Sequence, residues 1–215
     1  RMSFASMNSP GVFETRAMDA YYNITNVDPE WDIQRQNQHL TYFNYAGLLG
    51  ISVHEAVPGH YTHGVFKRQS PSRVRKIFTP ASLSEGWAHY VEQMMLDEGF
   101  GGGDPKIRLG QLRRALQRHA RWYAGVEMHC FGATVEDAAK RYQDIAYFAE
   151  FPALRETQRG TYNPTYLYYA LGRMEILRLR EQESKAADFS LSEFHRELLA
   201  EGLPLPLYEE YLERH

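Results

Sequence analysis

The segment SVHEAVPGHYTHG, residues 52–64, carries side chains that can bind a metal ion. It opens with His54 and Glu55, the first two positions of the H-E-x-x-H pattern, in which two histidines on one helix face bind zinc and the glutamate activates a water. The position of the second histidine is taken by Pro58, and the next histidine is His60. The segment therefore predicts a metal site only if the chain near Pro58 departs from a regular helix.

Pro58 and Gly59 give a physical reason for such a departure. On an undistorted helix, His60 would lie about 240° around the axis from His54 and would face away from a metal bound there. Proline cannot donate a hydrogen bond to the carbonyl of residue 54, and its ring pushes on that turn, so the helix must kink or widen. A widened turn at Pro58 and Gly59 brings His60 back to the side of His54, which makes the proline part of the pattern.

A second segment, SLSEGWAHYVEQMM, offers a third metal ligand. On a helix, Glu85, His89 and Glu92 would share one face. The opposite face is apolar and carries Leu83, Trp87, Val91 and Met94. We select Glu85 as the ligand. From these residues alone, the simpler interpretation is that Glu85 closes a capping box with Ser82, its side chain bonding back to the Ser82 amide.

The whole chain limits the classes of function. Its 215 residues, of which 43% are hydrophobic, are enough for a sizeable core. A net charge of −3 with interspersed charges argues against nucleic-acid binding, and no apolar run approaches the roughly 18 residues of a membrane span. The single cysteine, Cys130, allows neither an internal disulfide nor a thiolate zinc site. The chain begins at Arg1, so we expect a longer precursor and assign no compartment.

The pattern of elements predicts a mainly α protein. Residues 1–31 hold short aromatic and β-branched runs that favour a small hairpin or extended segment, and residues 32–215 favour one helical domain of about six helices. The expected helix starts are Asp104 before Pro105, Asn163 before Pro164, and Ser190 with Glu193. The expected helix stops are Gly99, Gly132 and Gly202.

The two segments together resemble a known family. HEAVPGH, followed about 25 residues later by EGWAHYVE, resembles the paired H-E-x-x-P-G-H and E-G-W-x-x-Y-x-E motifs of the bacterial DUF885 family, whose members look like zincin metallopeptidases of the glutamate-zincin type. RWYAGVEMH, YLYYALGRMEILRLR and FHRELLAEGLPLPL resemble later segments of that family. Family members are longer, so we expect this chain to be the C-terminal, metal-bearing part, with an N-terminal helical region of the same protein missing.

The resemblance implies roles for particular residues. His54, His60 and Glu85 would be the zinc ligands, and Glu55 would be the general base. The chain departs from the usual aliphatic residue at His89, which would be either an extra ligand or a surface residue.

Three further positions match the family. His129 and Tyr169 would stabilise an oxyanion, and Arg121 would bind a substrate carboxylate. Each also has a structural alternative: His129 as the partner of a helix C-terminus or a packed core histidine, Tyr169 as part of an apolar stripe, and Arg121 as a salt-bridge partner. The stretch YNPTYLYY replaces a proline-glycine-glutamine-alanine run of many members, which leaves the pocket around Tyr169 open.

The leading hypothesis is a zincin-like helical metallohydrolase domain with a small N-terminal β segment. It would be a zinc-dependent hydrolase of peptide or related amide bonds, with zinc as its cofactor and Glu55 activating a water. One alternative is a non-catalytic, metal-bound helical scaffold or binding domain. Another is an all-helical interaction domain without metal. The sequence does not assign the substrate or choose between endo- and exo-cleavage.

Overall fold

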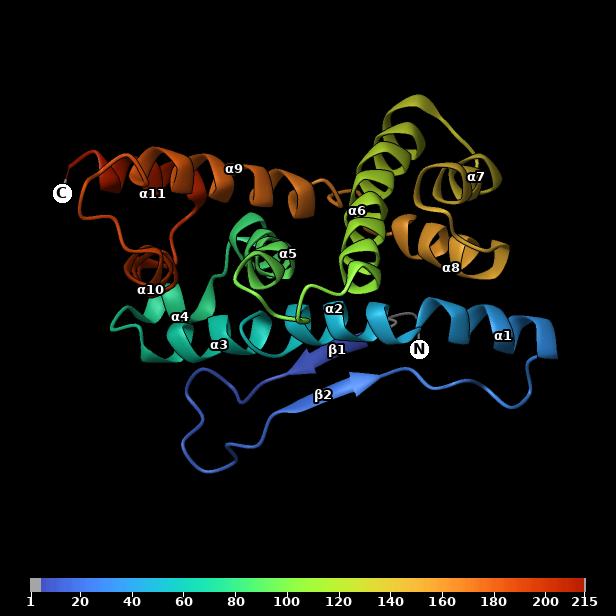
Figure 1. Ribbon diagram of the computed structural model, residues 1–215, viewed down its shortest axis with the longest axis horizontal. Coiled ribbons are helices and arrows are strands. Elements are labelled where there is room, and N and C mark those ends of the chain that lie inside the picture. The colour runs from blue at the N-terminus through green and yellow to red at the C-terminus, as the bar shows by residue number, and fades with distance from the viewer. Residues whose placement is uncertain (1–4, 215) are drawn as a thin grey trace.

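A small antiparallel hairpin precedes the helices. The computed structural model describes residues 5–214, and Figure 1 shows the hairpin below the row formed by the first helices. Strand β1 (Ala5–Asn8) pairs with β2 (Tyr21–Ile24), with Ala5 opposite Ile24 and Asn8 opposite Tyr21. The predicted hairpin and the mainly α fold class are confirmed; residues 1–4 of the predicted segment lie outside the described residues.

Eleven helices follow within residues 5–214. They are α1 (Ile33–Tyr42), α2 (Tyr45–Glu55), α3 (His60–Gln69), α4 (Arg73–Ile77), α5 (Ala81–Asp97), α6 (Pro105–Phe131), α7 (Val135–Ala146), α8 (Glu150–Gly160), α9 (Tyr168–Glu183), α10 (Leu191–Glu201) and α11 (Leu205–Leu212). The expected number of about six is wrong, because several short helices follow one another after single turns and the sequence pattern merges them. No helix among the described residues is both long and apolar enough to cross a membrane, as the sequence predicts.

Local signals place some helix ends and misplace others. The Asp104 side chain caps α6 and accepts a hydrogen bond of 2.8 Å from the Lys106 amide, as predicted. The start predicted at Asn163 is wrong. Its side chain accepts hydrogen bonds from the amide and hydroxyl of Thr165, at 3.3 and 3.0 Å, so it stabilises a local turn and α9 begins only after that turn.

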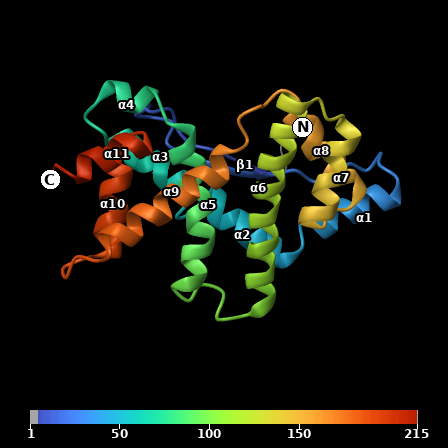
Figure 2. The same cartoon turned by 90° about the horizontal axis from the view of Figure 1, so that it is seen from above.

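Helices α5 and α9 pack unusually closely, and Figure 2 shows them crossing. A Cβ atom at Gly172 would lie 1.9 Å from the carbonyl oxygen of Ser82, and one at Gly86 would lie 2.5 Å from the backbone of Gly172. Only glycine fits at such a close approach of two backbones. This contact fixes the position of α5 against α9, and α5 is the helix that carries Glu85.

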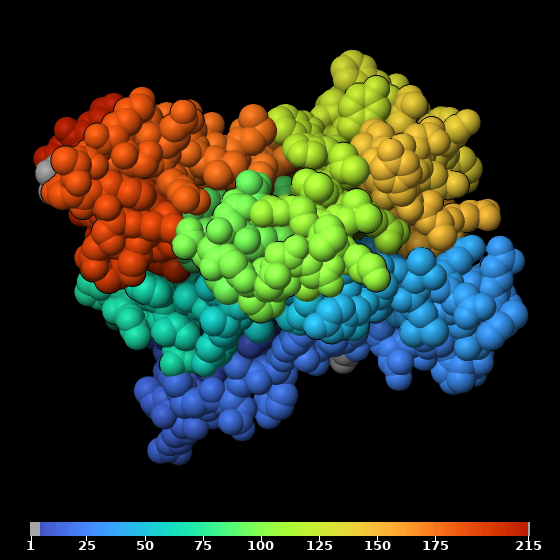
Figure 3. All heavy atoms as spheres, in the orientation of Figure 1, coloured from blue at the N-terminus to red at the C-terminus, as the bar shows by residue number. Residues whose placement is uncertain are grey.

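Two hydrophobic clusters flank the centre of the molecule. The first contains residues of α5, α9, α10 and α11, including Leu83, Trp87, Val91 and Met94, the face that the sequence predicts to be apolar. The second joins α1, α2, α6, α7 and α8 around Tyr142. In the space-filling view the hairpin forms a separate layer under α2 and α3 (Figure 3). Helices α2, α5 and α6 therefore meet between two packed cores, which hold their polar side chains in place.

Candidate metal centre

The chain changes direction between the two histidines of the first motif. Helix α2 ends at Glu55 and α3 begins at His60, so the expected single helix with a widened turn is wrong: the chain leaves one helix and starts another. Gly59 makes the turn fit, because a Cβ there would lie 1.8 Å from the carbonyl oxygen of His54. The two imidazole rings come together, with centroids 4.8 Å apart and planes at 84°.

A side chain of the second motif holds this turn. The Trp87 Nε1–H donates a hydrogen bond of 2.8 Å to the carbonyl oxygen of Pro58. Trp87 is only 2% exposed and belongs to the first hydrophobic cluster, so the turn is tied to a rigid part of the molecule. The sequence indicates only a core role for Trp87, although a buried indole N–H needs an acceptor, and this need is the signal of its second role.

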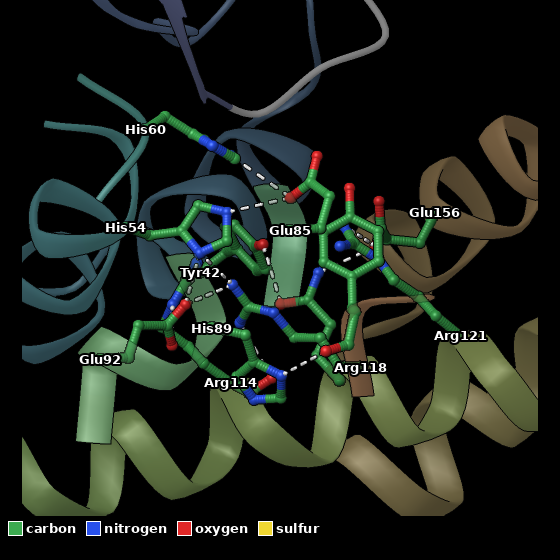
Figure 4. A network of polar contacts seen from close by, with 12 residues as sticks. Tyr42, His54, His60, Glu85, His89, Glu92, Arg114, Arg118, Arg121 and Glu156 are labelled. Carbon is green, nitrogen blue, oxygen red and sulfur yellow. Dashed lines mark hydrogen bonds and ion pairs between the residues drawn. The ribbon is translucent and has the colours of Figure 1, made fainter. Parts of the chain in front are cut away.

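Glu85 projects from the first turns of α5 toward both histidines (Figure 4). Its Oε2 lies 3.5 Å from Nε2 of His54 and 3.3 Å from Nε2 of His60. The alternative capping box does not form, since α5 begins at Ala81 and has no side-chain cap. One ligand atom from each of the three residues lies within 4.8 Å of the other two.

The chemistry of this group fits a zinc ion. With zinc–ligand bonds of about 2.0–2.2 Å, neighbouring ligand atoms of a tetrahedral site lie about 3.4 Å apart. The two distances from Glu85 match this spacing. Glu85 Oε2 is also buried and makes no hydrogen bond among the described residues, so this acceptor lacks the partner that a buried oxygen normally has. Two imidazoles and a carboxylate are a donor set typical of catalytic zinc.

Glu92 lies behind His54 and orients its ring. Glu92 Oε1 is 2.8 Å from Nδ1 of His54 and 2.5 Å from Arg118, and all three side chains are almost fully buried. A proton on Nδ1 shared with this carboxylate leaves the lone pair of Nε2 facing Glu85 and His60. The sequence placed Glu92 on the face of Glu85 without giving it this role.

The charges of the group stabilise one another. Burial alone would disfavour the charged carboxylate of Glu85, but the neighbouring imidazoles of His54 and His60 hold its pKa well below the ordinary value. Burial likewise disfavours the charged form of His60, yet Glu85 outweighs it and raises the pKa of His60 above its ordinary 6.5. Burial acts against the charge of Glu92 too, and Arg118 and Arg114 overcome it and lower the Glu92 pKa.

A cavity of about 240 Å³ opens beside the three candidate ligands. Its wall contains Glu55, Tyr169 and Arg121, three of the residues predicted to act on a substrate. The lining also includes residues of β1, Ala5, Ser6 and Met7, and residues of α6 and α8, Arg114, Gln117, Arg118 and Arg159. The fold therefore brings the predicted base, the predicted ligands and four arginines to one space.

Tyr169 lies at the start of α9 and is 4% exposed. Burial, and next the negative charge of Glu85, raise the pKa of Tyr169 well above its ordinary value, so the hydroxyl keeps its proton and can donate it in a hydrogen bond. His89 lies under this residue, with Nδ1 3.3 Å from the Tyr169 carbonyl oxygen. Because His89 is fully buried, the expectation that it is a surface residue is wrong; burial lowers its pKa and keeps it neutral.

Arg121 is held by a buried carboxylate. Its Nε and Nη2 atoms both lie 2.6 Å from Oε2 of Glu156. Its guanidinium lies over two aromatic rings, with Cζ 5.2 Å from the ring centroid of Tyr166 and 4.9 Å from that of Tyr169. Gln117 donates a further hydrogen bond of 2.8 Å to the same oxygen. The structure thus shows the salt-bridge alternative for Arg121, although its guanidinium also faces the cavity.

His129 lies away from the cavity. It is an exposed residue in the last turn of α6, and its Nε2 is 2.9 Å from the carbonyl oxygen of Gly160. It is not among the residues that line the cavity. The structure therefore does not bring it together with the candidate ligands.

The comparisons with known proteins agree with this arrangement of helices. The family model described as "Bacterial protein of unknown function (DUF885)" matches residues 2–212. The solved structure of "a putative lipoprotein of unknown function from Shewanella oneidensis" is 31% identical with a TM-score of 0.83, covering 99% of this chain and 39% of that one. The solved structure of "the putative lipoprotein from Colwellia psychrerythraea" is 27% identical with a TM-score of 0.83, and the match covers 99% of this chain and 36% of that one.

No curated protein matches the sequence. The chain spans well under half the length of the two similar solved structures, and the family description assigns no activity to its members. The match over nearly the whole sequence settles the family alone: this chain belongs to the bacterial DUF885 family.

Proposed function

We propose that this protein is a zinc-dependent hydrolase of peptide or related amide bonds. The observation that carries the proposal is the convergence of His54, His60 and Glu85 on one side of a cavity that Glu55 also lines. Metal ligands with a carboxylate beside an open space are the parts of a hydrolytic zinc site.

Each residue has a role in the proposed reaction. A zinc ion held by the three ligands would polarise the substrate carbonyl and lower the pKa of a water to about 7. Glu55 takes one proton from the attacking water and passes it to the leaving nitrogen as the C–N bond breaks. The water oxygen stays on the new carboxyl group, whose remaining proton passes to the released amine, so the products are a carboxylate and an ammonium group. The Tyr169 hydroxyl donates a hydrogen bond to the carbonyl oxygen as negative charge develops on it.

The experiment compares the parent protein with Glu55→Gln and Gln93→Ala. Glutamine keeps the shape of Glu55 but cannot accept the proton, so hydrolysis of a peptide library should fall by about 10²- to 10⁴-fold, with zinc content and thermal unfolding unchanged. Gln93 is on α5, the helix of Glu85, outside the cavity, and serves as the matched control. Mass spectrometry of the products reads out the cleavage.

Three other outcomes contradict parts of the proposal. Equal activity of Glu55→Gln and the parent protein would show that another residue is the general base. Loss of zinc in that variant would make Glu55 a ligand. Zinc binding by a parent protein that cleaves no peptide in the library would favour the non-catalytic, metal-bound scaffold.

A further inference from the structure

Four arginines line the cavity, and three of them are committed to buried carboxylates. Arg118 is 2% exposed and hydrogen-bonds Glu92, and Arg114 lies 3.5 Å from the same carboxylate. Arg121 holds Glu156 through two atoms. These three guanidinium groups have structural partners, so the fourth is the one to consider for a ligand.

Arg159 differs from the others. Among residues 5–214 its guanidinium makes no hydrogen bond, and its one ion-pair contact is long, 3.9 Å from Nη1 to Oε1 of Glu156. Its side chain is 24% exposed, and it lies 5.6 Å over the ring of Tyr166, which steadies the planar group. Arg159 therefore presents unused donors to the cavity in a fixed orientation.

The net charge of the site favours an anionic ligand. The four arginines are balanced by four carboxylates, two in the cavity wall, Glu55 and Glu85, and two behind it, Glu92 and Glu156. A divalent cation at the candidate ligands would leave this balance positive by two charges. A planar guanidinium with free donors matches a carboxylate, which accepts two parallel hydrogen bonds from it.

We infer that Arg159 binds the C-terminal carboxylate of a peptide substrate, which makes the protein a carboxypeptidase-type enzyme. The inference rests on the proposed function for its cleavage step. Because one cavity of about 240 Å³ holds both the candidate ligands and Arg159, a chain whose carboxylate reaches Arg159 presents a bond close to its C-terminus to Glu55. The products are a short C-terminal fragment with a new amine and a shortened peptide with a new carboxylate.

The first test is a binding measurement on the metal-free protein, which needs no turnover. Isothermal titration calorimetry compares acetyl-Ala-Ala-Ala with a free C-terminus, the same peptide as its C-terminal amide, and acetyl-Ala-Ala-Asp amide, whose only carboxylate is on the side chain. The free acid should bind about ten- to a hundredfold more tightly than either amide, the value of a hydrogen bond to a charged group. Equal binding of the aspartate amide and the free acid overturns the C-terminal assignment.

The variants are Arg159→Gln, Arg159→Lys and Arg141→Gln. Arg141 is a matched control, since it is an arginine ion-paired with Glu127 at 2.9 Å and lies outside the cavity. Arg159→Gln should remove the preference for the free acid, Arg159→Lys should keep part of it, and Arg141→Gln should keep all of it. A preference that survives Arg159→Gln overturns the inference.

The second test uses the zinc-loaded protein and the same peptides. Arg159→Gln should raise KM for the free acid about ten- to a hundredfold and leave kcat nearly unchanged, because the carboxylate is bound equally in the ground state and the transition state. Binding that depends on Arg159 without any cleavage would contradict the proposed function and keep the anion site. Cleavage that ignores the C-terminal group would contradict the anion site and keep the proposed function.

Discussion

Charged groups are paired differently on the two sides of the cavity, the side of the candidate metal ligands (the ligand side) and the side formed by α8 (the α8 side). On the ligand side, Glu92 is fully buried and is held at short distance by His54 and Arg118. On the α8 side, Glu156 is equally buried, but it holds Arg121 closely and Arg159 only at 3.9 Å. The first arrangement holds His54 and Arg118 on one carboxylate oxygen at short distance and suits positioning. The second leaves a guanidinium available and suits recognition.

The largest expected effect comes from removing the carboxylate on the ligand side. Glu92→Ala leaves the guanidinium of Arg118 buried without its counter-charge and His54 without its acceptor, so the free energy of unfolding should fall by about 3–5 kcal/mol. Zinc affinity should fall by about 10- to 100-fold. Urea unfolding of the metal-free protein and zinc titration measure the two effects.

Glu127→Ala is the control for that variant, because Glu127 belongs to a more exposed ion pair with Arg141. It should cost much less stability than Glu92→Ala and leave zinc affinity unchanged. If the two variants lower the free energy of unfolding equally, the buried ion pair of Glu92 stabilises the protein no more than the more exposed ion pair of Glu127.

The next effect concerns pH. The pKa of His60 is raised above 6.5 by Glu85, and zinc binds only the deprotonated ring. Zinc affinity should therefore be full above the pKa of His60 and fall by about tenfold for each pH unit below it, starting above pH 6.5. Glu85→Gln removes the negative charge that raises the pKa of His60. In this variant the fall in the residual zinc affinity should therefore begin at lower pH. Zinc titrations from pH 5 to 9 measure this, and a curve unmoved by Glu85→Gln would contradict the coupling.

A smaller effect is expected from the hydrogen bond that holds the turn. Trp87→Phe removes the donor to the carbonyl of Pro58, which should cost about 1 kcal/mol for the hydrogen bond, with a further loss from the smaller side chain. Zinc affinity should fall as well, because His60 follows this turn.

Tyr90→Phe serves as the comparison, since Tyr90 is buried in the same cluster and its hydroxyl hydrogen-bonds His195 at 2.7 Å and Arg180 at 3.1 Å, whereas Trp87 donates to the carbonyl of Pro58. It should lose stability and keep its zinc affinity. If both variants keep full zinc affinity, the turn does not depend on Trp87.

The smallest effect is expected on the α8 side. Arg159 makes no hydrogen bond among the described residues, so Arg159→Gln should change the free energy of unfolding by only about 0.5 kcal/mol or less. Thermal unfolding checks this. A loss comparable to that of Glu92→Ala would show that Arg159 is structural and would remove the contrast between the two sides.

The sequence predicted those parts of the site that depend on local pattern. His54 and Glu55 follow from the motif, and Pro58 with Gly59 predicts a departure from a regular helix between the histidines, although not the complete break into two helices. The helix face offers Glu85 as a ligand, but the choice over the capping box came from the family resemblance. Local pattern also suffices for the mainly α class and for the cap of α6, since both depend on residues a few positions apart.

Contacts between distant segments could not be predicted in this way. Arg118 reaches Glu92 across 26 positions of sequence, and Arg121 reaches Glu156 across 35. Such pairs depend on how α6 packs against α5 and α8, which helix periodicity does not specify. The same reason explains why Arg159 was not predicted, since nothing in its own segment marks it. It also explains His89, which the family resemblance left as either a ligand or a surface residue.

The most direct test of the account is anomalous scattering at the zinc edge from crystals of the protein grown with zinc. We expect one strong peak per chain among Nε2 of His54, Nε2 of His60 and the carboxylate of Glu85, and no peak in the same position for His60→Ala. A peak bound by His89 instead, or no peak at these three residues in the parent protein, would contradict it.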